Sequence, residues 1–99
     1  MYYCMGITKD QCELMKAIDR SDFEKAKNLV AKGVKPFFKT LDSIIDTPLS
    51  LAAHKGNLEM VKWLVEVCGV QYDEDFVSFI ASTGQIEITL YLAHRIKKK

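Results

Sequence analysis

Few residues in this chain are of the types that do chemistry, and they lie far apart in the sequence. His54 has no second histidine and no cysteine at helical spacing, so it lacks the convergent partners that a metal or catalytic site requires. We interpret His54 as a surface histidine whose role, if any, is to contact a partner. His94 lies near the end of the last expected helix, where the helix dipole favours a cation.

The cysteines Cys4, Cys12 and Cys68 are an odd number, and no Cys-x-x-Cys pair occurs among them. Their wide spacing is unlike a small disulfide framework, so we expect a reducing compartment and a cytoplasmic protein. Cys12 opens an expected helix but has no apparent base. Cys68 ends one, where the helix dipole raises the pKa of a thiol. Neither is predicted to be a nucleophile.

The glycines also argue against an enzyme. All five lie at chain ends or at expected helix stops. No phosphate-cradling glycine loop, nucleophile elbow or metal-ligand cluster is present. We therefore predict that the protein is not an enzyme and that it holds no cofactor and no metal.

The composition is that of one soluble globular domain. The 99 residues are 48% hydrophobic and 27% charged, which suits a single domain over residues 1–99. A formal net charge of +1 gives no electrostatic basis for binding nucleic acid. No apolar run approaches the roughly 18 residues of a membrane span, and Lys97 to Lys99 are expected to be a solvated terminus. We expect neither a nucleic-acid partner nor a membrane partner.

Three stretches of the sequence share one pattern of apolar and small residues: Leu14 to Lys32, Thr47 to Glu66 and Val77 to His94. Equivalent positions are 35 residues apart between the first two stretches and 28 apart between the last two. The helical parts therefore stay in register while their connections differ in length, as loops do in repeat proteins. The equivalent residues are Leu14, Leu49 and Val77; Ala17, Ala52 and Ile80; Ile18, Ala53 and Ala81; Ser21, Gly56 and Gly84; Phe23, Leu58 and Ile86; and Leu29, Leu64 and Leu92.

Each stretch is predicted to fold as two short antiparallel helices. In the middle stretch, Thr47 can cap the first helix, Pro48 suits its first turn, and Gly56 ends it. Asn57 can cap the second helix, which ends near Cys68 and Gly69. The apolar stripes are Leu49, Ala52 and Ala53 on the first helix and Leu58, Val61, Leu64 and Val65 on the second.

The flanking stretches follow the same plan. The first helix of the first stretch is expected to begin near Cys12, and that of the third stretch after Asp75. Asp22 and Gly33 delimit the second helix of the first stretch. A helix pair cannot bury its apolar face alone, so the pairs must stack. The sequence predicts an all-α solenoid of about three helix-pair repeats.

The segment from Thr47 to Val65 resembles an ankyrin repeat, whose pattern is Thr-Pro-Leu-His-x-Ala-Ala, two variable residues, Gly, and a second helix opening near Leu-Glu-x-Val. Ser50 stands at the histidine position. The resemblance implies repeats at 11–33, at 34–70 including a long connector at 34–46, and at 71–99 with a C-terminal cap. It also implies loops that project to one side and a concave face made by the first helices.

The connector between the first two repeats carries five large apolar residues. We expect Phe37, Leu41 and Ile44 to fold onto the stack. The alternative leaves Phe37 and Phe38 partly exposed as an aromatic anchor for a partner.

The resemblance implies a protein-binding module with a polar rim around an apolar anchor. The candidate surface combines the connector with the variable ends of the first helices, and we expect a monomer that binds another protein as an inhibitor, adaptor or microbial or viral effector. The alternative is a fragment of a longer array or a self-associating stack, in which Tyr2, Tyr3, Met5 and Ile7 form a cap or an interface. The predicted partner-binding residues are Asp19, Arg20, Phe37, Phe38, Asp46, His54, Lys55, Ser82 and Thr83.

Overall fold

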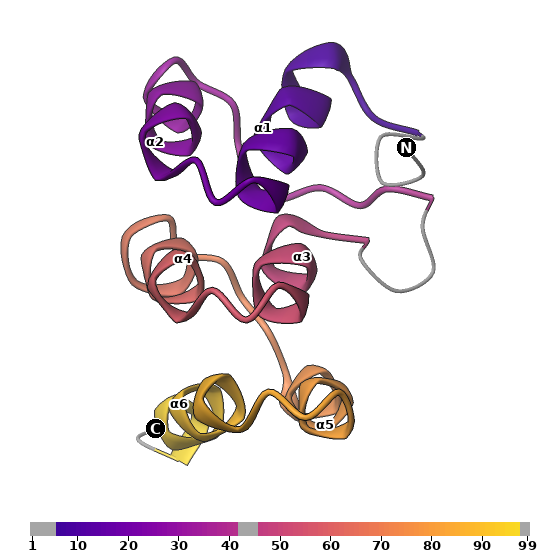
Figure 1. The fold of residues 1–99 in the computed structure, drawn as a ribbon, viewed down its shortest axis with the longest axis vertical. Coiled ribbons are helices and arrows are strands. Elements are labelled where there is room, and N and C mark those ends of the chain that lie inside the picture. Colours follow the sequence, from indigo (N-terminus) through magenta and orange to yellow (C-terminus); the bar gives the residue numbers. More distant parts are fainter. Residues whose placement is uncertain (1–5, 42–45, 98–99) are drawn as a thin grey trace.

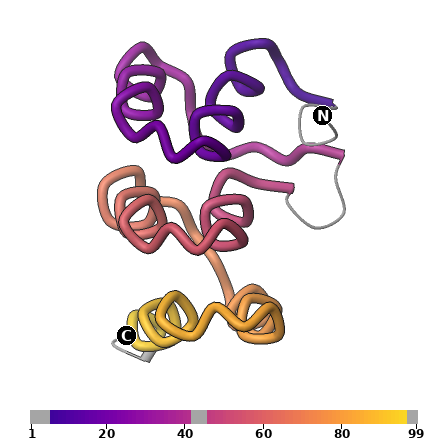
Figure 2. Tube along the Cα trace, viewed as in Figure 1, coloured from indigo at the N-terminus to yellow at the C-terminus, as the bar shows by residue number. Residues whose placement is uncertain are grey.

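The computed structural model describes residues 6–41 and 46–97, and these form a stack of three helix pairs (Figure 1). The first helices α1, α3 and α5 make one layer and the second helices α2, α4 and α6 make the other; Figure 2 follows the chain between them. No strand occurs within the described ranges. The elements are α1 (Lys9–Asp19), α2 (Phe23–Ala31), α3 (Pro48–His54), α4 (Leu58–Lys62) continued by η2 (Trp63–Val67), α5 (Glu74–Ser82) and α6 (Ile86–Lys97). The predicted all-α repeat solenoid is confirmed.

The turn inside each helix pair is built in the same way. Ser21, Gly56 and Gly84 occupy equivalent positions, and all three have a positive φ, at 57°, 75° and 86°. The residue that follows is Asp22 or Asn57 in the first two pairs, and its side chain accepts a backbone N–H of the second helix. One left-handed residue reverses the chain, and the next residue caps the helix that follows.

Two first helices start earlier than the sequence predicted. The N-cap of α1 is Thr8 rather than a residue near Cys12, and Thr8 and Gln11 form a reciprocal capping box. The N-cap of α5 is Asp73 rather than Asp75, because the Asp73 carboxylate accepts the Phe76 N–H at 2.9 Å. The start of a first helix is therefore determined by the capping side chain just before it. It cannot be read from the equivalent positions of the other repeats.

The second helix of the middle repeat changes its winding halfway. After Lys62, the segment Trp63–Val67 is a π-helix, and the Cys68 N–H donates to the Trp63 carbonyl, five residues earlier, at 3.1 Å. The helix then ends at Gly69, whose φ is 74°. The predicted end near Cys68 and Gly69 is confirmed, but no sequence pattern indicated the wider turn.

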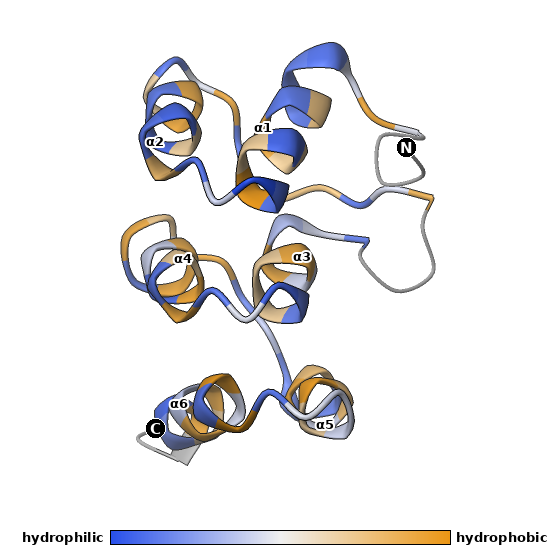
Figure 3. Cartoon of the chain, in the orientation of Figure 1, coloured by the Kyte–Doolittle hydropathy of each residue, from blue (hydrophilic) through white to orange (hydrophobic). Residues whose placement is uncertain are grey.

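The equivalent residues of the three repeats form the core between the two layers. Figure 3 shows the alternation of hydrophobic and hydrophilic residues along these helices. Most of the predicted columns are buried, and Ala52 and Ala53 are fully covered because an alanine lets neighbouring helices approach closely. The third repeat departs from this, since Val77 is half-buried and Ala81 is exposed. The buried members are Leu14, Ala17, Ile18, Leu29, Leu49, Ala52, Ala53, Leu64, Ile80 and Leu92.

Side chains near the turns tie each repeat to the next. Lys55 Nζ lies 3.1 Å from Asp19 Oδ1, and Asn57 Nδ2 donates to Ser21 Oγ at 3.3 Å. The Gln85 amide donates to the His54 carbonyl at 3.2 Å. These contacts are exposed, so each contributes little alone, but they repeat along one edge of the stack.

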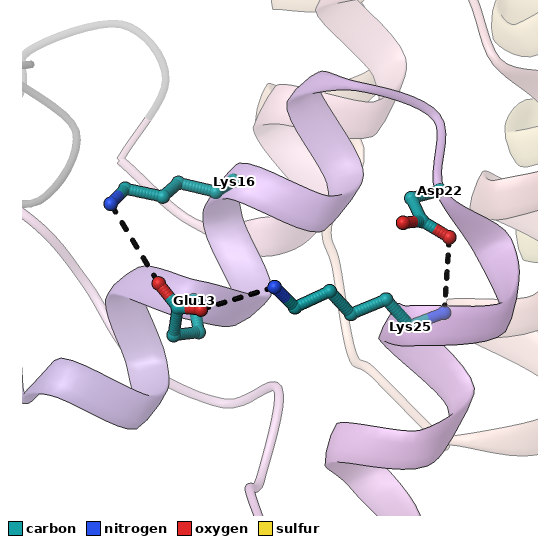
Figure 4. Close-up of polar contacts among 4 residues, drawn as sticks. All are labelled: Glu13, Lys16, Asp22 and Lys25. Carbon is teal, nitrogen blue, oxygen red and sulfur yellow. Dashed lines mark hydrogen bonds and ion pairs between the residues drawn. The ribbon is translucent and has the colours of Figure 1, made fainter.

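The second helices are linked by aromatic residues. The rings of Phe23 and Trp63 meet edge to face with centroids 5.4 Å apart, and the Tyr91 hydroxyl donates to the Glu66 carboxylate. Trp63 and Tyr91 are both half-buried. Within the first repeat, Glu13 on α1 reaches Lys25 on α2 at 3.1 Å and Lys16 at 3.7 Å (Figure 4). The hydrogen bond from Lys25 lowers the pKa of Glu13.

Replacing Ser21 with glycine is expected to stabilise the fold. A non-glycine residue in the left-handed region costs about 1–2 kcal/mol. The greater freedom of glycine in the unfolded chain and the loss of the exposed Asn57–Ser21 hydrogen bond offset part of that gain. We expect the free energy of unfolding to rise by about 0.5–1 kcal/mol and Tm by roughly 3–6 °C, measured by denaturant and thermal melts. Gly56→Ala is the matched control at the equivalent position, where φ is 75° and an added Cβ would lie 3.1 Å from Gln85 Oε1. It should lower stability, and stabilisation by both changes would contradict this account.

The Tyr91 phenol is expected to titrate late. Burial, then the hydrogen bond to Glu66, raises the pKa of Tyr91 to about 12. The folded state thus keeps this proton above the ordinary tyrosine pKa of about 10, so stability is fully present below about pH 10 and falls as the pH rises through 12. Absorbance titration at the tyrosinate band should show a late step that moves to lower pH in Glu66→Gln but not in Glu59→Gln, an exposed control on the same helix. An unmoved step in Glu66→Gln would contradict the assignment.

Candidate functional site

An open groove of about 930 Å³ lies where the connections before α3 and α5 approach each other. We name it the connector groove. Its lining is mainly apolar and aromatic, with the carboxylates of Asp46 and Asp73 and the ammonium of Lys39 among the polar groups. The lining consists of residues 36–39, residues 46–50 apart from Pro48, residues 70–73 and Phe76.

The connector that forms one wall is pinned to the stack at alternate residues. Pro36 and Thr40 are buried and Phe38 is half-buried against the core, whereas Phe37 and Lys39 are exposed. The Thr40 N–H donates to the Asp46 carbonyl at 2.6 Å, which closes the far end of the connector. This spacing of two presents Phe37 and Lys39 on the side away from the core.

The expectation that Phe37 and Leu41 fold onto the stack is wrong. Phe37 is 56% exposed and Leu41 is 73% exposed. Phe38, which the alternative left exposed beside Phe37, is instead the ring that packs against the core. Neighbouring residues of an extended segment face opposite sides, so Phe37 and Phe38 could not both be anchors. Ile44 lies outside the described residues.

A chain of hydroxyl hydrogen bonds fixes the start of α3 beside the groove. The Ser50 N–H donates to Thr47 Oγ1, and the Thr47 hydroxyl donates to Ser50 Oγ, both at 3.0 Å. The Ser50 hydroxyl in turn donates to Asp46 Oδ1 at 3.1 Å. Ser50, which replaces the histidine of the ankyrin pattern, thus bonds within its own segment. Asp46 also lies 3.8 Å from Lys39 Nζ, so the carboxylate faces both the connector and the helix start.

The opposite wall was not predicted from the sequence. Tyr72 and Phe76 contribute two rings with centroids 6.2 Å apart, and the Tyr72 hydroxyl donates to the Leu92 carbonyl at 2.7 Å. That bond and the half-burial of Tyr72 hold its ring in place, and burial raises the pKa of its phenol. One available signal was that Phe76 occupies the repeat position of Pro48, at the start of a first helix.

The predicted binding residues fall into two separate groups. Phe37, Phe38 and Asp46 line the groove before α3. The other six lie at the C-terminal ends of the first helices, and the seven residues of α3 put about 10 Å between its two ends. The structure therefore does not bring the two groups together into one surface. The six are Asp19 and Arg20 at the end of α1, His54 and Lys55 at the end of α3, and Ser82 and Thr83 at the end of α5.

The helix-end group is largely engaged with its own chain. Asp19 pairs with Lys55, the Ser82 hydroxyl donates to the Phe79 carbonyl at 2.6 Å, and the Thr83 hydroxyl donates to the Ile80 carbonyl at 2.7 Å. Arg20 and His54 are exposed. The group is polar and lacks an exposed aromatic ring, so it has no candidate anchor.

The side chains of types that take part in catalysis or metal binding are dispersed over the described residues. Burial raises the pKa of the Cys68 thiol, in the predicted direction, and leaves less of the reactive thiolate. Cys12 is disulfide-bonded, which its spacing did not lead us to expect, and disulfides persist mainly in oxidising compartments. Within residues 6–41 and 46–97 no group of three or more metal-ligating side chains gathers.

None of the helices in those same ranges is both long enough and apolar enough to cross a membrane. Comparison with the curated proteins and with the solved structures found no match to the chain. The family model for ankyrin repeats in three copies matches residues 14–99. The stack of helix pairs, its left-handed turns and this match over most of the chain establish that the protein belongs to the ankyrin repeat family.

Proposed function

We propose that this protein binds another protein through the connector groove, without catalysis, and that Phe37 is the anchor of the contact. Ankyrin repeats are generally protein–protein interaction modules and are typically non-catalytic. The observation that carries the proposal is the exposure of Phe37, a large aromatic ring, on the wall of a groove whose opposite wall holds Tyr72 and Phe76.

The groove suits a partner because its walls are already fixed. Phe38 and Thr40 hold the connector, and the bond between Tyr72 and Leu92 holds the other side. A partner that inserts an apolar side chain between these aromatic rings pays little to order them, which favours affinity. Tyrosine and other aromatic residues are also enriched where binding energy concentrates.

Charged groups at the groove supply a rim of both signs. Lys39 is exposed, with its ammonium 3.8 Å from the Asp46 carboxylate, and Asp73 lies on the opposite wall. Such groups set the orientation and the rate of association more than the affinity. We propose that an extended segment or loop of the partner lies in the groove, with an apolar side chain against Phe37 and polar groups facing this rim.

The proposal is tested by replacing Phe37 with glutamate and measuring partner binding. The immobilised chain is used to capture proteins from an extract of its source cells, and the captured partner is then purified for titration. Loss of the anchor and burial of a carboxylate in its place should weaken binding by at least roughly tenfold. Leu41→Glu is the matched control, because Leu41 is exposed on the same connector but does not line the groove.

A second variant set distinguishes the groove from the helix ends. The triple change Arg20→Ala, His54→Ala and Lys55→Ala removes three side chains of the helix-end group and should leave the affinity within about twofold. Full binding by Phe37→Glu together with loss of binding in the triple variant would move the site to the helix ends. Equal weakening by Leu41→Glu would show that charge on the connector, and not the groove, is responsible.

A further inference from the structure

The outer face of the third repeat is apolar and uncovered. Phe79 on α5 is 39% exposed, and Ile86 and Leu90 on α6 are 70% and 65% exposed. The residues at the equivalent positions of the second repeat are more covered or polar: Leu51 is 1% exposed, Leu58 is half-buried, and Lys62 replaces the leucine. We name Phe79, Ile86, Leu90 and the adjacent Glu87 and His94 the end face.

The same positions in the second repeat contact the repeat that follows. Lys62 Nζ lies 5.6 Å from the centre of the Tyr91 ring, and the Glu66 carboxylate accepts the Tyr91 hydroxyl. Leu90 and His94 are the equivalents of Lys62 and Glu66, 28 residues later. The end face therefore occupies positions that elsewhere in this chain meet another helix pair, and a leucine stands where the second repeat uses a lysine.

The first repeat ends the stack differently. Glu13 and Lys25 form an ion pair at positions where the second repeat has the buried Pro48 and Met60. Residues 6–34 contain no large exposed apolar side chain, in contrast to the end face. The charged face of the first repeat would bind the apolar end face only weakly, because its charges would lose water without gaining polar partners. Head-to-tail stacking, with the first repeat of one chain on the third repeat of another, is therefore disfavoured.

We propose that the end face binds the end face of a second copy of this chain, which gives a two-fold symmetric dimer stacked third repeat to third repeat. A two-fold axis makes each patch meet itself, so an apolar patch needs no other partner surface. Glu87, Leu90 and His94 follow one another at spacings of three and four along α6, and therefore lie on one stripe. When two α6 helices lie antiparallel across the axis, the two Leu90 side chains meet near the centre.

The charges on this stripe fit the antiparallel pairing. Glu87 precedes Leu90 by three residues and His94 follows it by four, so each Glu87 carboxylate faces the His94 imidazole of the second copy and accepts its N–H. A parallel pairing would instead place like residues opposite one another.

The dimer leaves the connector groove free, because none of the end-face residues lines that groove. The sequence alone led us to expect a monomer, and the uncovered apolar end face is the reason for proposing a dimer instead. The proposal does not rest on the function of the groove, so the variants at Phe37 and those at Leu90 report on separate surfaces.

The test is sedimentation equilibrium of the full chain across a range of concentrations. The weight-average mass should rise from 11.3 kDa towards twice that value between about 5 µM and about 500 µM. Leu90→Glu places a carboxylate opposite the same carboxylate of the second copy at the two-fold axis. It should therefore raise the dimer dissociation constant at least tenfold. Circular dichroism and a thermal melt should show an unchanged fold, because Leu90 is 65% exposed.

Two controls address charge and position. Val67→Glu makes the same kind of change at a residue that is 74% exposed on the second repeat and should leave dimerisation intact. Glu87→His and His94→Glu should each weaken the dimer, because like groups then face each other, and the double variant exchanges the two groups and should restore it.

Three outcomes overturn the proposal. A wild-type mass that stays at 11.3 kDa at about 500 µM assigns the end face to some other occupant, such as a helix pair of a different protein. A mass that climbs beyond that of a dimer shows open-ended stacking. A dimer that persists unchanged in Leu90→Glu lies on another surface.

Discussion

No helix pair in this chain can bury its apolar side chains without a neighbouring pair, and the rest of the structure follows from that constraint. Two antiparallel helices cover only the sides that face each other. Ala52 and Ala53 are fully buried because α1 of the preceding repeat and α4 of the same repeat lie close against α3, which larger side chains at these positions would prevent. In the middle repeat, stacking therefore combines small residues on the first helix with branched residues such as Leu64 on the second.

The stacking constraint fixes some segments and leaves others free. The turn inside each pair must reverse the chain within a few residues, so one left-handed residue stands at Ser21, Gly56 and Gly84. The connections between pairs are under no such restriction, and their lengths differ between the first and second junctions. Variation in this family can accumulate in these connections without disturbing the core, and they supply most of the lining of the connector groove.

The sequence predicted the stacked helix pairs well and the connections between them poorly. The apolar columns, the turns and the stacking were predictable, because burial imposes a regular spacing on the residues concerned. The starts of α1 and α5 were not, because the caps Thr8 and Asp73 act locally and lie outside the repeat register. The course of the connector was also missed. Whether Phe37 or Phe38 faces the core depends on contacts with distant residues and on the bond between Thr40 and Asp46, which no local pattern specifies.

The two outer faces of the described stack differ in chemistry. The second repeat lies between two others, so both of its faces can be apolar. The first repeat places Glu13 and Lys25 where the second has Pro48 and Met60. The third repeat makes no such exchange at Ile86 and Leu90. Exposing these side chains forgoes about 25 cal/mol for each Å² that burial would remove from water. The proposed dimer recovers part of this free energy, because it removes Ile86 and Leu90 from water.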